Sequence, residues 1–158
     1  MDIYNFLLPK YKKYNVELFL RGEEVDYKGR FLNDILNFSD KELEDCHDYI
    51  QCIFPTDNIS KFNKTVIISK EKAAKLAKDE IIIDNMKKSF NRMLKFYKNN
   101  NHWIKSNNHN LMRITRILHS LEMFGLEEEI REFKIFLKEI HDKNKNVFTT
   151  KTISLWKI

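Results

Sequence analysis

Apolar residues recur every three or four positions through the second half of the chain, which is the spacing of one face of an α-helix. Residues 107–126 show this most fully, with apolar positions at Leu111, Ile114, Ile117, Leu118, Leu121 and Phe124. Similar spacings predict two further amphipathic helices, over residues 80–98 and 126–141. Gly125 stands between two of these helices as a C-terminal stop.

The first half of the chain carries shorter patterns. Short helices are predicted over residues 2–8 and 31–38, and Ser69 is expected to cap another that runs to about residue 78. Residues 11–20 fit either a helix or an extended segment. The apolar tail, residues 152–158, is expected to dock on the body of the protein.

Residues 39–55 predict one continuous helix. Ser39, followed three residues later by Glu42, forms the capping-box pattern at its start, and Pro55 ends it. Residues 56–68 then predict an irregular connection, in which residues 66–68 form either a short strand or a buried plug.

Together these elements predict an all-α fold, a single compact helical domain of about six helices over residues 1–158. The chain is long enough to bury a sizeable core, and its three Gly and two Pro supply few of the turns that an all-β fold needs. No apolar run approaches the length of a membrane span, and the first residues lack the basic region and cleavage site of a secretory leader.

The net charge of +5 is unevenly distributed. Residues 1–60 hold 7 Lys and Arg against 12 Asp and Glu, whereas residues 61–105 hold 12 against 4. Such a basic middle segment can meet an anionic partner, but Lys-rich helices also occur simply as solvated faces. Cys46 and Cys52 would lie about 240° apart on the predicted helix, which prevents their pairing, so free thiols and a reducing, cytoplasmic location are expected.

Two blocks of sequence resemble a known family. HDYIQCIFP, residues 47–55, is similar to the HDYIQWLFP signature of the opioid growth factor receptor domain family. HNLMRITRILHSLEMFGLE, residues 109–127, is similar to its second signature, HNxLRITRILxSLxxLGLE. A D-x-x-G-R-x-L segment, residues 26–32, precedes both, and the resemblance covers about residues 18–140.

The resemblance implies a compact all-helical domain. The best-known animal member of the family is a receptor for an enkephalin peptide and is associated with nuclear membranes, whereas bacterial, fungal and viral members resemble only its N-terminal domain. This chain lacks the long C-terminal extension of the animal receptor, and Cys52 stands where the family usually has Trp. On the predicted helix, position 52 faces away from the apolar side.

A polar stripe runs along the helix over residues 107–126, beside its apolar face. His109, Arg113, Arg116 and Ser120 follow one another at i, i+4, i+7 and i+11, which places them within about 60° of one another. The polar residues shared with the family signatures are the candidate ligand-binding residues: His47, Gln51, His109, Asn110, Arg113, Arg116 and Ser120.

These residue types suit an anionic ligand, because guanidinium groups bind carboxylate or phosphate through two hydrogen bonds and histidine can add a proton donor. The structural alternative is that Arg113 pairs with acidic residues of the first sixty and that His47 satisfies a buried carbonyl group. In that alternative Asn108 or Asn110 caps the helix, and Thr115 bonds to its own preceding turn.

The sequence therefore favours a non-enzymatic binding module, with no cofactor and no metal, for an anionic small molecule, peptide or protein. Nucleic acid is a possible partner, since Tyr97, His102 and Trp103 lie in and beside the basic segment. An enzyme acting on a phosphorylated or carboxylated substrate is the other alternative. No paired carboxylates, Ser–His–Asp order, glycine-rich phosphate loop or metal-ligand spacing supports it.

Overall fold

The computed structural model describes residues 14–58 and 66–158, and its fold is all-α, as predicted. Nine helices occur in these ranges rather than about six: α2 (Val16–Leu20), α3 (Leu32–Leu36), α4 (Asp40–Asp45), α5 (Ile50–Ile53), α6 (Lys70–Leu76), α7 (Glu80–Asn99), α8 (His109–Met123), α9 (Glu127–Lys143) and α10 (Thr150–Trp156). None of the described helices is long and apolar enough to cross a membrane. The helix predicted over residues 2–8 lies outside the described residues.

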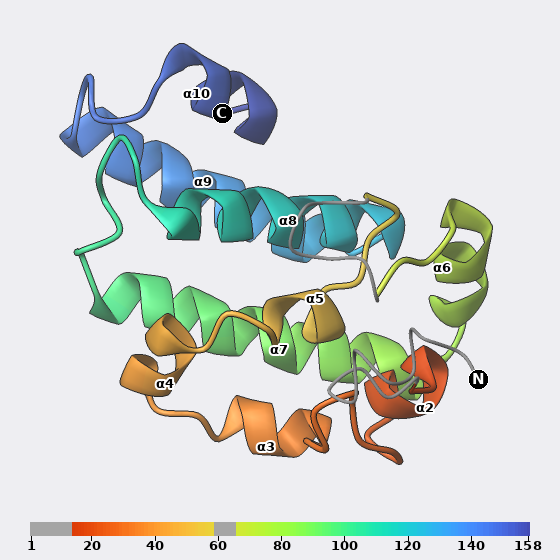
Figure 1. Ribbon diagram of the computed structural model, residues 1–158. Helices are drawn as coiled ribbons and strands as arrows, with labels where there is room; N and C mark the ends of the chain where they lie inside the picture. The colour runs from red at the N-terminus through yellow and green to blue at the C-terminus, as the bar shows by residue number, and fades with distance from the viewer. Residues whose placement is uncertain (1–13, 59–65) are drawn as a thin grey trace, which may run out of the picture.

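The long helix α7 runs through the middle of the molecule (Figure 1). Helices α2, α3 and α4 lie along one side of it, and α8 and α9 lie along the other, with α10 beyond them. Helix α8 packs against α6, α9 and α10, while α7 packs against α2, α3 and α9. The short helix α5 lies in front of α7 and faces α8, which brings the two signature blocks together.

Aromatic side chains link α7, α9 and the C-terminal part of the core. The Tyr97 ring stacks on Phe133 at 6.1 Å, and the Trp103 ring stacks on Phe148 at 6.2 Å. Both Tyr97 and Trp103 are almost completely buried, and the Trp103 indole N–H donates to main-chain carbonyl groups. Burial therefore removes both rings from any surface that could stack on nucleotide bases, which weakens the nucleic-acid alternative.

The helix starts follow the capping signals in the sequence. The Ser39 hydroxyl accepts from the Glu42 amide while the Glu42 carboxylate accepts from the Ser39 amide, as the capping box predicts. Ser69 caps α6 in the expected way through the Lys72 amide. Asp79 caps the long helix α7, a role that the apolar spacing of the helix alone did not predict.

The helix predicted over residues 39–55 is interrupted. Helix α4 ends at Asp45, Cys46 has an extended ψ of 127°, and α5 begins at Ile50. In a continuous helix the Leu43 carbonyl would accept from the amide four residues later. Here it accepts instead from the Tyr49 hydroxyl at 2.7 Å and from Arg113 Nη1 at 2.8 Å. These tertiary hydrogen bonds replace the helical ones at the break.

The break also changes the position of the cysteines. Cys46 and Cys52 are free thiols, as expected, but they lie on separate segments, so the argument from one continuous helix does not hold. Cys52 is fully buried and does not face outward as predicted. Its side chain therefore belongs to the core.

The connection before α6 combines both of the expected alternatives. Val66 and Ile68 are buried, while the exposed Ile67 between them forms an isolated parallel bridge with Thr56. At the other end of the chain, the tail docks on the body as predicted. It does so as the helix α10, whose Trp156 is fully buried.

Candidate functional site

Arg113 of α8 is directed at the interrupted segment between α4 and α5. Its Nη1 donates to the Leu43 carbonyl at 2.8 Å, and its Nη2 donates to the Cys46 carbonyl at 2.7 Å. The guanidinium lies 5.4 Å from the centre of the Tyr49 ring, and the residue is only 6% exposed. Arg113 therefore binds main-chain carbonyl groups, rather than the acidic side chains of the structural alternative.

The next part of the polar stripe holds the end of α5. Arg116 Nε donates to the Phe54 carbonyl at 3.1 Å, and the Ser120 hydroxyl donates to the Pro55 carbonyl at 2.8 Å. Carbonyl groups at a helix C-terminus have no partner within the helix. The stripe of α8 supplies those partners, and so it fixes α5 in place against the body.

Arg116 retains unused hydrogen-bonding capacity. Its Nη2 is buried, yet it has no hydrogen-bond partner in the part of the chain that the structure describes. No Asp or Glu of the described ranges forms an ion pair with it, and residues 59–65 contain neither residue type. Burial lowers the pKa of Arg116 to about 10, a shift that the nearby Cys52 and Tyr14 only partly oppose. Within residues 14–58 and 66–158, the side chain is thus a partly exposed cation without a counter-charge.

Gln51 of α5 has an unused acceptor. Its Oε1 is buried and has no partner among the described residues, while its Nε2 lies 3.5 Å from the His47 carbonyl oxygen. Gln51 lies within α5, and Phe54 is the residue that ends this short helix. Because Arg116 Nε donates to the Phe54 main-chain carbonyl, the residue with the unused donor contacts the end of the helix that carries the unused acceptor.

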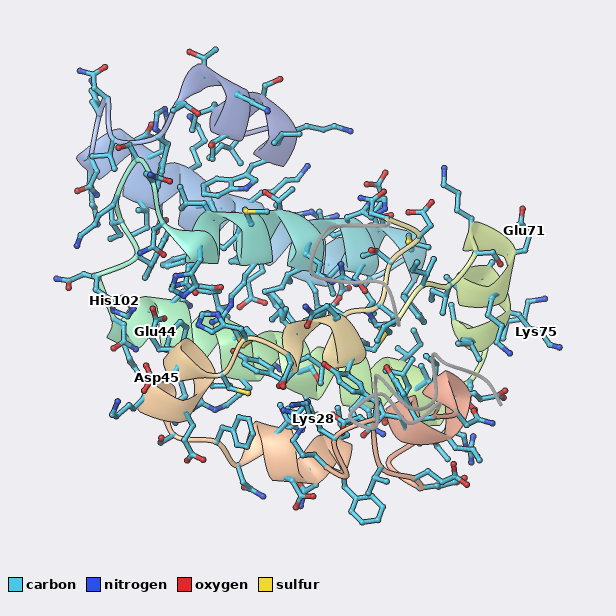
Figure 2. The ribbon with its side chains drawn as sticks, viewed as in Figure 1. Lys28, Glu44, Asp45, Glu71, Lys75 and His102 are labelled. Atoms are coloured by element: carbon cyan, nitrogen blue, oxygen red, sulfur yellow. The ribbon has the colours of Figure 1, made fainter. Side chains whose placement is uncertain are left out.

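At the N-terminal end of the stripe, polar side chains gather around Glu44 of α4. His109 Nε2 lies 3.0 Å from one carboxylate oxygen, and His102 Nε2 and Asn110 Nδ2 lie 3.1 Å and 3.0 Å from the other. Figure 2 shows Glu44 beside His102 of the α7–α8 connection. The His47 ring meets the His109 ring edge to face at 5.2 Å. We call these five residues the Glu44 cluster.

The charges of the Glu44 cluster influence one another. Burial raises the pKa of Glu44, but hydrogen bonds from Asn110 and His102 and the charge of His109 outweigh it, so the pKa is lowered. The pKa of His109 is also lowered, because burial outweighs the attraction of Glu44. Among the described residues, no three His, Cys, Asp or Glu side chains are arranged to hold a metal ion. The cluster is accordingly a hydrogen-bonded group built on one carboxylate.

Comparison with known protein families tests the family resemblance that the two signature blocks suggested. A family model described as the opioid growth factor receptor (OGFr) conserved region matches residues 9–102. The chain belongs to this family. No curated protein and no solved structure matches the chain. The matched range contains the HDYIQCIFP block, and α8 lies beyond it, whereas the resemblance in the sequence extended to about residue 140.

In this OGFr-family domain the seven candidate residues do not converge on one pocket. His47, His109 and Asn110 belong to the Glu44 cluster, and Gln51, Arg116 and Ser120 lie at or near the end of α5, with Arg113 between the two groups. Asn110, Arg113 and Ser120 are buried, while His47 and His109 are exposed. A ligand-binding role for these residues stays a prediction.

Parts of the structural alternative are confirmed. Asn108 caps α8, and the Thr115 hydroxyl donates to the Leu111 carbonyl of its own preceding turn. The exposed His47 contacts His109 instead of a buried carbonyl. The sequence did not predict two polar contacts. One joins the Glu44 carboxylate to His102, His109 and Asn110, and the other joins His119 to Asp57 at 2.6 Å. Glu44 follows the acidic first turn of α4, so its sequence context gave no reason to separate it from its acidic neighbours.

Proposed function

We propose that this OGFr-family domain is a non-enzymatic binding module that takes up an acidic group of a peptide at Arg116. The observation that carries the proposal is the buried Arg116 Nη2, which has neither a hydrogen-bond acceptor nor a carboxylate among the described residues. A buried N–H group without an acceptor is unfavourable by about 1–3 kcal/mol. A ligand carboxylate would remove that penalty.

Gln51 favours a peptide over a simple anion. Its unpaired Oε1 requires a donor, whereas Arg116 Nη2 requires an acceptor. A peptide chain offers both, because each acidic side chain or terminal carboxylate is accompanied by main-chain N–H groups. An inorganic anion without protons can satisfy only Arg116.

In this proposal the remaining candidate residues have different tasks. Arg113, Asn110 and Ser120 are positioning residues, since their hydrogen bonds hold α4 and α5 against α8. His47 and His109 form the exposed edge of the ligand surface, next to Glu44. The proposed cytoplasmic location rests on the two free thiols.

The other two functions have less in their favour. A nucleic-acid surface loses two of its three candidate stacking residues, because Tyr97 and Trp103 are buried. The contact between His119 and Asp57 is of the kind found in hydrolases, but none of the described Ser or Cys side chains hydrogen-bonds to His119. We therefore propose binding rather than catalysis.

The test is a thermal-shift screen of the full chain with short peptides that carry a free or an amidated carboxylate, compared with phosphate and nucleotides. A peptide with a free carboxylate should raise the melting temperature of the wild type and of the control Lys75→Met, an exposed cation on α6 (Figure 2). Arg116→Met should abolish that rise, and Gln51→Ala should reduce it.

The stability of the variant without ligand completes the test. Arg116→Met keeps the aliphatic packing and removes both an unpaired N–H group and the Nε hydrogen bond to the Phe54 carbonyl. These two effects have opposite signs, so its own melting temperature should change little. A marked fall in melting temperature, with no peptide response in the wild type, would show that Arg116 is part of the scaffold. That result would overturn the proposal.

A further inference from the structure

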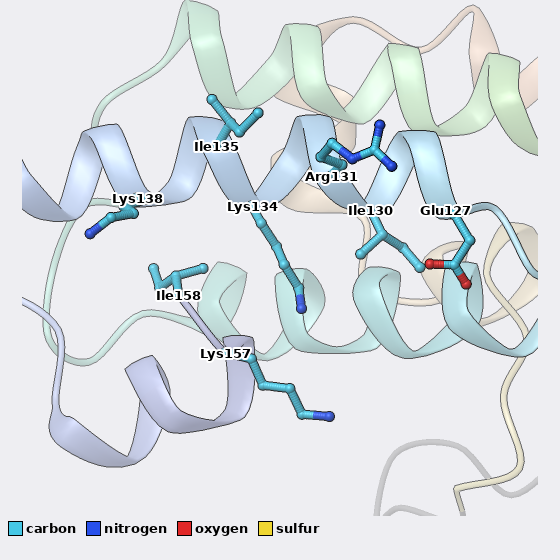
Figure 3. Close-up of a pocket in the computed structure, with 8 residues that line it drawn as sticks. All are labelled: Glu127, Ile130, Arg131, Lys134, Ile135, Lys138, Lys157 and Ile158. Atoms are coloured by element: carbon cyan, nitrogen blue, oxygen red, sulfur yellow. The ribbon is translucent and has the colours of Figure 1, made fainter.

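A second surface lies on the far side of α9, away from the signature blocks. An open groove of about 430 Å³ runs between α9 and the end of α10 (Figure 3). It is lined by Glu127, Ile130, Arg131, Lys134, Ile135, Lys138, Lys157 and Ile158. Lys157 has a left-handed φ of 55°, which ends α10 where the chain meets this groove. None of these residues belongs to the site proposed above.

One wall of the groove is a basic row on α9. Arg131, Lys134 and Lys138 follow one another at spacings of three and four, so they lie on one side of the helix over about 10 Å. Lys157 faces them from the other wall. Among the described residues, the one ion pair of these four cations is a 3.7 Å contact from Lys138 to Asp142, and both of those side chains are mostly exposed. The row is therefore largely unneutralised.

Aliphatic side chains separate the cations. Ile135, at the centre of α9, is 56% exposed. Ile130 and Ile158 are partly buried and complete the apolar part of the lining. The groove thus combines apolar contact area with four positive charges and one negative charge, that of Glu127.

We propose that this groove binds an acidic protein segment in which aliphatic side chains lie between carboxylates. The carboxylates would pair with Arg131, Lys134 and Lys138 at helical spacing, as an amphipathic helix does when it lies in a groove. The volume accommodates a few side chains of such a segment rather than a whole helix. The partner is defined by charge complementarity with the basic row and by the exposed Ile135.

An anionic lipid surface fits these charges less well. Beyond Ile135, the exposed residues Glu128, Glu132 and Glu139 form an acidic row, about 110° around α9 from the basic row. A flat membrane approaching Ile135 would meet this row as well and be repelled by it. A narrow peptide can contact the basic row alone.

The test uses the full chain and a labelled synthetic peptide of about four helical turns, with Glu at successive i, i+3 and i+4 positions and Leu between them. Fluorescence anisotropy should detect binding that weakens as salt is raised. Lys134→Glu/Lys138→Glu should weaken it at least tenfold, and Ile135→Ser should weaken it severalfold. Lys145→Glu/Lys151→Glu, which changes the net charge equally outside the groove, should leave it unchanged.

Three results would overturn the proposal. The first is equal loss of binding in both double variants, which would indicate attraction by net charge alone. The second is stronger retention on phosphatidylserine-containing vesicles than on the peptide, with the same dependence on Lys134 and Lys138. The third is concentration-dependent self-association that Ile135→Ser abolishes, since the groove would then be covered by a second copy of the chain.

Discussion

Arg113 Nη2 donates a 2.7 Å hydrogen bond to the main-chain carbonyl of Cys46, sixty-seven residues earlier in the chain. This contact joins the second signature block to the residue that immediately precedes the first block. It also explains why residues 39–55 do not form one helix, because the Cys46 carbonyl accepts from a guanidinium instead of from an amide one turn later. The arginine of α8 thereby determines the backbone path between α4 and α5.

Replacing Arg113 by Met should lower the free energy of unfolding by about 3 kcal/mol. The change leaves the carbonyl groups of Leu43 and Cys46 without a charged donor, and hydrogen bonds to charged groups contribute about 1.5–3 kcal/mol each. Urea denaturation monitored by circular dichroism measures the effect. Met112→Ala, at a 68% exposed position of the same helix, should change stability by less than about 0.5 kcal/mol.

The Arg113→Lys variant distinguishes charge from geometry. A lysine ammonium cannot reach both carbonyl groups in the planar fork that Arg113 uses, so it should restore less than half of the lost stability. Full restoration by lysine would show that positive charge alone is required at this position, and would contradict the proposed two-carbonyl contact.

Asp48 should make the fold sensitive to acid. Although burial raises the pKa of Asp48, hydrogen bonds from Cys46, Arg30 and Lys28 outweigh it and lower the pKa to about 2. In the unfolded chain the pKa of aspartate is about 3.9. The ionised Asp48 therefore stabilises the fold above about pH 4, and this contribution is lost as the pH falls through 2.

The expected result is that Asp48→Asn is less stable than the wild type at neutral pH, and that its stability falls less steeply between about pH 5 and pH 2. Urea unfolding at a series of pH values measures both. Asp84→Asn, at an exposed position of α7, serves as the control and should follow the wild-type curve. Parallel curves for Asp48→Asn and the wild type would refute the assignment.

The elements that the sequence predicted are those whose signals are local. The long apolar repeats of α7, α8 and α9, and the caps at Ser39 and Ser69, act within one or two helical turns, and they appear in the structure as predicted. The break after Asp45 is different, because it depends on Arg113 and on the hydroxyl of Tyr49. Periodicity in the sequence contains no information about such distant donors.

The same distinction applies to the candidate site. Helical spacing placed His109, Arg113, Arg116 and Ser120 on one face of α8, and each of them contacts α4, α5 or the residues around them. It could not show that the partners of three of them are main-chain carbonyl groups. Nor could it identify Glu44 and His102, whose roles arise only from the packing of α4 against the α7–α8 connection.

Cys52 marks a position at which the family's usual tryptophan should not fit this core. The thiol is fully buried, and burial raises its pKa to about 12. Cys52→Trp should lower the free energy of unfolding by about 1–3 kcal/mol, since extra volume in a packed core forces its neighbours to move. Chemical denaturation measures the change, and Cys46→Ala on the partly exposed segment is the comparison. An increase in stability would indicate unfilled space beside position 52.

Trp156 should anchor α10 to α8. Its indole N–H donates to the Thr115 hydroxyl at 2.9 Å, and that hydroxyl in turn donates to the Leu111 carbonyl. Trp156→Ala should lower the free energy of unfolding by about 3–5 kcal/mol, because it removes a fully buried indole. Thr115→Val should lower it by about 1 kcal/mol, since only the hydrogen-bonding group is lost. Leu155→Ala, which is 54% exposed on the same helix, should have little effect in the same denaturation experiment, and an equal loss there would argue against Trp156 as the anchor.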